Sequence, residues 1–306
     1  MVRFCSVAVL AALSAASTMF GQVVGVGTFI HVVANLDKTI QFYGNDLGLE
    51  LTGAPGPRAF AANAVVEGLY DAKGSQSRVA VLRIPGSPLG VEFVEFKGVS
   101  QKPVRSSVQD PRTGTLVLKV PDLNATMLRL EHDGARMASP SVVTDPDGFL
   151  VELVQSGESG AGLILTVGST DRTLRLFRDL LGFQPTVGNA FVKDKDRLRA
   201  LSLPKASYRS STAQVPGTSF DVEFLEFKGV ARHPVSAGIH DPGAGVLRLL
   251  VRDFDSIFGK LRGAGVPVVS ADGEPVTIAG TRRAVILRDP DGFFFQLLTA
   301  PPSAAK

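Results

Sequence analysis

The amino-acid sequence predicts an α+β fold built from two similar halves. Residues 91–99 read V-E-F-V-E-F-K-G-V and residues 222–230 read V-E-F-L-E-F-K-G-V, which is a nearly identical repeat. Each half also alternates apolar, strand-like runs with amphipathic, helix-like runs. A D-P-D-G-F turn occurs late in both halves, at residues 145–149 and 289–293. Together these observations predict a duplicated domain of mixed strands and helices.

The length and composition are those of a globular protein. The chain has 306 residues, enough for about two domains of ordinary size. Hydrophobic residues make up 44% and charged residues 20%, which allows a substantial core. The net charge is only +3, and the basic residues are spread along the chain without a basic stripe. A nucleic-acid partner is therefore not expected.

The first 21 residues have the order of a secretory signal peptide. Arg3 precedes an apolar run at residues 4–13, and small residues follow at 14–17. We therefore predict a secreted or periplasmic protein with no stable membrane span after cleavage, and an uncleaved N-terminal anchor is the alternative. The only cysteine, Cys5, lies inside this segment. A cleaved chain would contain no cysteine, which excludes disulfides, thiolate catalysis and zinc–cysteine sites.

Two copies follow the signal segment. Residues 37–49 align with residues 171–183, and Asp110-Pro111 aligns with Asp241-Pro242. We predict a first domain at residues 22–156, a flexible linker at 157–161, a second domain at 162–300 and a short tail at 301–306.

Each copy contains the same unit twice. In the first copy, strands are predicted at residues 28–33, 78–84 and 91–96, and a helix at 37–47 is stopped by Gly48. The pattern then restarts with a strand at 115–120, a helix from Asp122 to about residue 132, and a last strand at 149–154. Each copy is thus two β-α-β-β-β units.

These motifs resemble the vicinal oxygen chelate superfamily, which includes glyoxalase I, bleomycin and fosfomycin resistance proteins and extradiol dioxygenases. The resemblance rests on His31 followed by the D-x-x-x-x-F-Y-x-x-x-L-G-L helix, and on D-P-D-G-F-L-V-E-L-V-Q at residues 145–155. It implies two tandem domains, each of two βαβββ units whose mixed sheets curl into a cup. It also implies that a metal, where present, is held by side chains on the first and last strands of the units that line one cup.

The resemblance places candidate ligands at four strand positions of the first copy. His31 shares a strand face with Phe29 and Val33, and Glu152 lies on the last strand. Both interrupt apolar faces, where a charged group is costly unless it is paired or binds a metal. Glu92 stands where glyoxalase I carries a glutamate, and Thr115 stands where many relatives have a second histidine.

We therefore predict a metal site of His31, Glu92 and Glu152, with Glu92 or Glu152 as a base and Thr115 as a further binding position. Mixed nitrogen and oxygen ligands suit Zn, Mn, Ni or Fe(II). Thr115 counts against dioxygenase chemistry, for which the resemblance implies two histidines. The alternative is that His31 only hydrogen-bonds Glu152 and that Glu92 is a solvated edge residue.

The corresponding positions of the second copy are Leu165, Glu223, Val246 and Gln296. Leucine and valine cannot bind a metal, and glutamine is a weak, neutral ligand. We predict no metal in the second domain, with Glu223 and Gln296 as binding residues only.

The pairing of the units stays open. If each copy folds on itself, the four positions of the first copy share one cup. In a swapped arrangement the first unit pairs with the fourth and the second with the third. The candidate ligands would then be divided between two cups.

Three functions are compatible with these residues. The first is a metal-dependent enzyme, of the lyase, isomerase or dioxygenase-like kind, that acts on a small oxygen-rich organic molecule. The second is a metal-free protein that binds and sequesters such a molecule, similar to the bleomycin-resistance branch. The third is a structural scaffold. In each case we expect a monomer or a homodimer.

Overall fold

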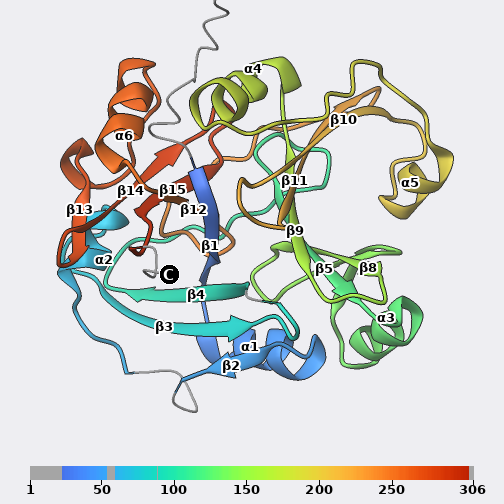
Figure 1. Cartoon of the computed structure of the whole chain (residues 1–306). Coiled ribbons are helices and arrows are strands. Elements are labelled where there is room, and N and C mark those ends of the chain that lie inside the picture. The colour runs from blue at the N-terminus through green and yellow to red at the C-terminus, as the bar shows by residue number, and fades with distance from the viewer. Residues whose placement is uncertain (1–22, 54–58, 88, 303–306) are drawn as a thin grey trace, which may run out of the picture.

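The computed structural model describes residues 23–53, 59–87 and 89–302, and its strands form two mixed sheets (Figure 1). The predicted signal segment, with Cys5, lies outside the described residues, so export stays a prediction. Within the described part of the chain, no helix is long and apolar enough to cross a membrane.

The first copy contains the two predicted units. The elements of the first unit are β1 (Val23–Val33), α1 (Leu36–Ile40), the π-helical turn η1 (Gln41–Asp46), β2 (Glu50–Thr52), α2 (Ala64–Leu69), β3 (Gln76–Arg83) and β4 (Gly90–Lys97). Those of the second unit are β5 (Gly114–Val120), α3 (Leu123–His132), β6 (Arg136–Ser139), β7 (Val142–Thr144) and β8 (Leu150–Gln155).

The second copy repeats this order. Its third unit contains β9 (Ala161–Thr166), α4 (Thr170–Leu174), η2 (Arg175–Leu180), α5 (Lys195–Ala200), β10 (Ser207–Gln214) and β11 (Asp221–Lys228). Its fourth unit contains β12 (Gly245–Val251), α6 (Phe254–Gly263), η3 (Ala271–Gly273), β13 (Val276–Ala279), β14 (Arg282–Arg288) and β15 (Phe294–Thr299).

Side-chain caps and glycines set the helix boundaries. The predicted cap at Asp122 is confirmed, because its carboxylate accepts a hydrogen bond from the N–H of Ala125. The predicted helix at 37–47 begins slightly earlier, after Asn35, which caps the N–H of Lys38. Gly48 follows it with a φ of 77°, a conformation that glycine adopts at little cost.

The sheets show that the units pair in the swapped arrangement. Sheet A has the strand order β13-β14-β15-β12-β1-β4-β3-β2, so it joins the fourth unit to the first. Sheet B has the order β10-β11-β9-β5-β8-β7-β6 and joins the third unit to the second. Antiparallel pairs, β1 with β12 and β5 with β9, close the two seams. Each sheet therefore contains strands from both copies.

Each sheet has one face toward a large shared core and one toward its own smaller cluster. We call these smaller faces cup A, lined by Ile30, Val32, Val94, Val246 and Ile286, and cup B, lined by Val142, Leu150, Ile164, Leu225 and Phe227. Leu69 and Tyr70 at the end of α2 pack in cup A, and Leu198 and Leu201 of the α5 segment pack in cup B. The shared core contains residues of both sheets, among them Phe29, Leu118 and Leu165.

The two glutamates of the repeated V-E-F-x-E-F segment have different surroundings. Glu95 accepts a hydrogen bond from the N–H of Leu36 at the start of α1 and pairs with Arg78. Glu226 does the same for Thr170 and Arg209 in the second copy. This second glutamate of the repeat therefore anchors a helix start in each copy, whereas the first glutamate lies in a cup.

Candidate functional site

The structure does not bring His31, Glu92 and Glu152 together. Glu92 on β4 bonds to Arg248 in sheet A, while Glu152 on β8 bonds to Arg197 in sheet B. His31 does share its strand face with Phe29 and Val33, as predicted, but both of these residues belong to the shared core. The neighbouring Ile30 and Val32 line cup A instead. The predicted three-ligand site is therefore not formed, because the swapped pairing separates the two glutamates and His31 lies on the other face of β1.

His31 instead contacts the D-P-D-G turn that joins β7 to β8. Its Nε2 lies 2.7 Å from Oδ2 of Asp145, and its Nδ1 lies 3.2 Å from the carbonyl oxygen of Ala244. The side chain is buried and packs on the ring of Phe149 at 4.6 Å. Burial by itself would lower the pKa of His31, but the carboxylates of Asp145 and Asp147 outweigh it and raise that pKa.

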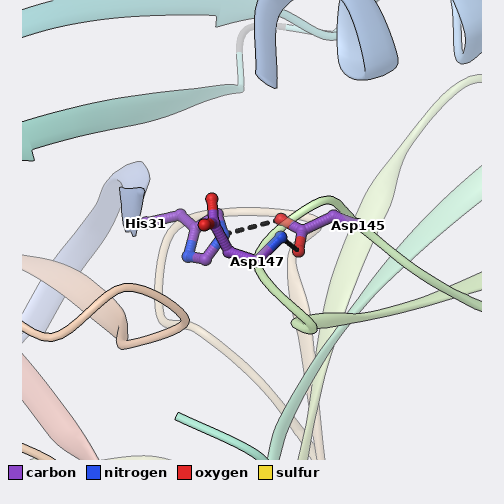
Figure 2. Close-up of side chains that lie close together, drawn as sticks. All are labelled: His31, Asp145 and Asp147. Atoms are coloured by element: carbon purple, nitrogen blue, oxygen red, sulfur yellow. Dashed lines mark hydrogen bonds and ion pairs between the residues drawn. The ribbon is translucent and has the colours of Figure 1, made fainter. Parts of the chain in front are cut away.

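Backbone groups orient both aspartates of this turn, which lie beside His31 in Figure 2. Oδ1 of Asp145 accepts hydrogen bonds from the N–H groups of Asp147 and Phe149, each at 2.9 Å, and Oδ2 accepts one from the hydroxyl of Tyr43 at 3.2 Å. Oδ1 of Asp147 accepts a hydrogen bond from the N–H of Ala34 at 3.1 Å. Oδ2 of Asp147 is buried and has no hydrogen-bond partner among the described residues. Burial raises the pKa of Asp147.

This arrangement fits a divalent metal ion. His31, Asp145 and Asp147 each offer one ligand atom, and the three atoms lie within 4.8 Å of one another. One imidazole nitrogen and two carboxylate oxygens suit Mn, Fe(II), Ni or Zn. Metal-binding histidines usually donate their second ring N–H to a carbonyl or carboxylate, as His31 can do to Ala244. Oδ2 of Asp147 has no hydrogen-bond partner among the described residues, so it is available as a third metal ligand.

The two aspartates border a cleft of about 900 Å³. Its walls come from the α1–η1 segment, the loop at residues 103–106, the residues after α3, and the D-P-D-G turn. The cations in this wall are Lys38, Arg105 and Arg136, and none of them forms an ion pair with another described residue. A polar molecule in this cleft would thus meet these three cations, while Oδ2 of Asp147 is buried next to the cleft.

The second copy has the same turn without the same ligands. The positions of His31 and Tyr43 are taken by Leu165 and Phe177, which offer no ligand atom. Asp289 caps its turn through Oδ1, but its buried Oδ2 has no hydrogen-bond partner in the described part of the chain. Burial and the nearby Asp291 raise the pKa of Asp289 to about 7.

Cup A contains a largely buried arginine, Arg248, beside Glu92. Arg248 on β12 donates two hydrogen bonds to the Glu92 carboxylate, at 2.8 and 3.0 Å. It also donates to the hydroxyl of Thr28 at 2.6 Å and to Oε1 of Gln296 at 2.5 Å. Gln296, predicted as a binding residue, is therefore a partner of Arg248.

Cup B contains another arginine. Arg197 on α5 donates to both oxygens of Glu152, at 2.5 and 3.3 Å, and to Oε2 of Glu223 at 3.2 Å. Burial raises the pKa of Glu152, while Arg197 acts to lower it. The hydroxyl of Ser210 donates to Oε1 of Glu223 at 2.6 Å. Thr115, the fourth predicted position, is buried, and its hydroxyl has no partner among the residues described.

Four residues that the sequence analysis missed carry these sites, namely Asp145, Asp147, Arg197 and Arg248. The D-P-D-G motif was interpreted only as a turn, although its repetition and its acidic pair were visible. Arg248 was detectable as the one charge inside the apolar strand V-L-R-L-L-V. Arg197 lies in a polar helix and gave no comparable signal.

The comparisons with known proteins agree with this fold. Residues 25–153 and 161–297 each match the Glyoxalase/Bleomycin resistance protein/Dioxygenase superfamily. Among solved structures, glyoxalase I from Zea mays is similar with a TM-score of 0.61 and 16% identity, covering 91% of this chain and 92% of that one.

A putative dioxygenase from Bacillus subtilis is also similar, with a TM-score of 0.57 and 16% identity over 92% of this chain and 86% of that one. Likeness at these identities concerns the fold alone. A search of curated proteins found no match. The two tandem matches cover most of the chain, which therefore belongs to the Glyoxalase/Bleomycin resistance protein/Dioxygenase superfamily.

Proposed function

We propose that this protein binds a small, oxygen-rich organic molecule in the cleft beside Asp147, with a divalent metal ion held by His31, Asp145 and Asp147. The observation that carries this proposal is the buried, unpartnered Oδ2 of Asp147, which lies in a cluster with an imidazole and a second carboxylate. The metal would be Zn, Mn, Ni or Fe(II). It would lie outside both cups.

The protein groups around this site have separable tasks. The carbonyl of Ala244 orients the His31 ring. Backbone N–H groups of the turn fix Oδ1 of Asp145, and the N–H of Ala34 fixes Oδ1 of Asp147. Burial and Asp145 raise the pKa of Tyr43 far above its ordinary value, so its hydroxyl remains a hydrogen-bond donor. When bound, the metal would polarise adjacent oxygens of the small molecule.

The cleft wall carries basic side chains as well as the acidic side chains of Asp46, Asp133, Asp145 and Asp147. Lys38, Arg105 and Arg136 stand in its wall without carboxylate partners among the described residues. A carboxylate or enolate oxygen of the bound molecule would be attracted to these cations. The side of the cleft that carries Asp145 and Asp147 would receive its metal-binding oxygens.

A second candidate function is metal-free binding of such a molecule in the same cleft. The observation in its favour is the direct contact of 2.7 Å between Nε2 of His31 and Oδ2 of Asp145. As an ion pair, His31 and Asp145 neutralise each other's charge and share a hydrogen bond, so neither needs a metal. His31 and Asp145 would then only fix the turn, and the cleft cations would bind the ligand.

Metal analysis of the purified protein and of one variant separates the two candidates. Asp147→Asn keeps an oxygen for the N–H of Ala34 but removes the free ligand oxygen. The metal hypothesis predicts about one divalent ion per chain in the wild type and at least a tenfold weaker affinity in the variant. The protein should be purified without chelator, because a chelator would remove the ion.

Asp291→Asn is the matched control, because Asp291 occupies the same turn position in the second copy. Its carboxylate pairs with Arg172 and with the N–H of Gly168. This variant should retain the metal. A wild type without stoichiometric metal, whose ligand-induced rise in melting temperature is unchanged by chelator, would leave only the metal-free candidate.

A further inference from the structure

The resemblance implied that a metal, where present, is held by side chains on the first and last strands of the units that line one cup. In cup A the polar side chains at this place are Thr28, Glu92, Arg248 and Gln296, on β1, β4, β12 and β15. In cup B, Glu152 on β8 and Glu223 on β11 lie at the corresponding place. We infer that a guanidinium group takes the place of the metal ion in each cup.

The contacts of the arginines support this inference. Each guanidinium bonds to the carboxylates that a metal would otherwise bind, with two hydrogen bonds to one glutamate in each case. Arg197 and Arg248 are largely buried, with 25% and 16% of their side chains exposed. A fixed cation at this position uses the carboxylate lone pairs and repels a second cation. The cups therefore do not fit a divalent ion.

The two arginines come from positions that do not correspond in the repeat. Arg248 lies on β12, and its counterpart on β5 is Val117. Arg197 lies on α5, and its counterpart on α2 is Val66. Each cup thus obtains its cation from a different element, while Glu92 and Glu223 occupy corresponding positions.

The charge requirement explains this outcome. A carboxylate that is largely removed from water is costly without a partner, and both copies have the first glutamate of the V-E-F-x-E-F repeat, 20% exposed as Glu92 and 25% exposed as Glu223. An arginine supplies the opposite charge in a planar fork that matches the carboxylate. Because the cation is part of the chain, the cups need no metal. This conclusion does not depend on the ion proposed beside His31.

Cup B offers the sharper test, because it contains two carboxylates. Arg197→Ala leaves Glu152, Glu223 and the Ser210 hydroxyl facing one another. We expect this variant to bind one more Mn²⁺ per chain than the wild type, counted by electron paramagnetic resonance of the free ion. Arg199→Ala is the matched control, since Arg199 lies on the same helix with an exposed side chain and, among the residues that the structure describes, forms its ion pair with Asp196. It should bind as many ions as the wild type.

Two further variants identify where the additional ion binds. Adding Glu152→Gln to Arg197→Ala should abolish the gain, whereas Asp147→Asn should not. If Arg197→Ala folds but gains no ion, the guanidinium does not occupy a metal position and the inference fails. If Arg197→Ala does not fold, Glu152→Gln and Glu92→Gln in the otherwise wild-type chain decide. Unchanged Mn²⁺ binding in both supports the inference, and a loss in either one overturns it.

Discussion

The D-P-D-G turns of the two copies have the same backbone hydrogen bonds, but the first aspartate has polar neighbours in one copy and apolar neighbours in the other. In both, Oδ1 of the first aspartate accepts the N–H groups two and four residues ahead. In the first copy, Oδ2 of Asp145 bonds to His31 and Tyr43. In the second copy, leucine and phenylalanine replace those two residues, and Oδ2 of Asp289 has no partner in the described chain.

This difference separates a structural role from a functional one. Both copies need the aspartate to cap the turn, so the carboxylate is present whether or not its second oxygen has a use. Only the first copy surrounds that oxygen with polar groups. The second copy keeps a buried carboxyl whose pKa is about 7, as expected for a buried acid beside a second carboxylate. An acidic residue shared by two repeats is thus weak evidence for shared chemistry.

The largest effect is expected for Asp145→Asn. The asparagine can still cap the turn, but His31 loses its buried carboxylate partner, and removing one member of a buried pair costs about 3 kcal/mol. Denaturant unfolding in the presence of chelator measures this loss of stability without a contribution from bound metal. A change below about 0.5 kcal/mol would show that the contact between His31 and Asp145 does not stabilise the fold.

Asp289→Asn should stabilise the folded protein, whereas Asp145→Asn should destabilise it. The pKa of Asp289 rises from an ordinary 3.8 to about 7 on folding, so the folded chain holds this proton more tightly than the unfolded chain. Its contribution to stability therefore falls as the pH rises from about 4 to 7, and stays low above 7. The shift sets a limit of about 4 kcal/mol, and we expect a gain of about 1–2 kcal/mol at pH 8.

The pH dependence is the decisive measurement for Asp289→Asn. Unfolding free energies at pH 5 and pH 8 should differ less in this variant than in the wild type. The charged neighbours Asp291 and Arg112 remain in place in this variant. Asp221→Asn, at an exposed site, is the control and should not stabilise the protein at pH 8. An unchanged profile in Asp289→Asn would mean that Asp289 is ionised in the folded protein.

The smallest effect is expected for Leu165→His, which transfers the partner of Asp145 to the second copy. Leu165 has the same strand partners as His31, because it pairs with Phe224 and Gly114 where His31 pairs with Phe93 and Gly245. A histidine there should pair with Asp289 and contribute about 1 kcal/mol at pH 6. A gain that persists in the Leu165→His, Asp289→Asn double variant would contradict this pairing.

The repeat predicted the units and most of their elements, but it could not predict the face of His31. Alternation reveals the buried face of a strand only when the other face is solvated. β1 has apolar residues buried on both faces, namely Phe29, Ile30, Val32 and Val33. The alternation along the strand therefore did not show whether His31 faces the cup or the shared core. The same limitation hid the role of Asp145, which depends on His31 being on the core side.

The placement of Glu92 and Glu152 in different sheets could not be predicted from the sequence, for a different reason. Both pairings of units bury the same apolar faces, and the linker between the copies is compatible with either. Glu92 and Glu152 share a cup in one arrangement and lie in different sheets in the other. The cations that neutralise them lie far away in the sequence, Arg248 in the case of Glu92 and Arg197 in the case of Glu152. Only the fold brings these charges together.

The seam between β1 and β12 has a consequence for the order of folding during synthesis. Sheet B uses strands from β5 to β11, so all of its strands are available before the last unit is made. β1 to β4 are synthesised first, yet β1 has to wait for β12 to complete sheet A. Such distant pairing slows folding and leaves apolar strands exposed for longer. A cut between the copies would leave one open seam on each sheet, so the two halves should not fold as independent proteins.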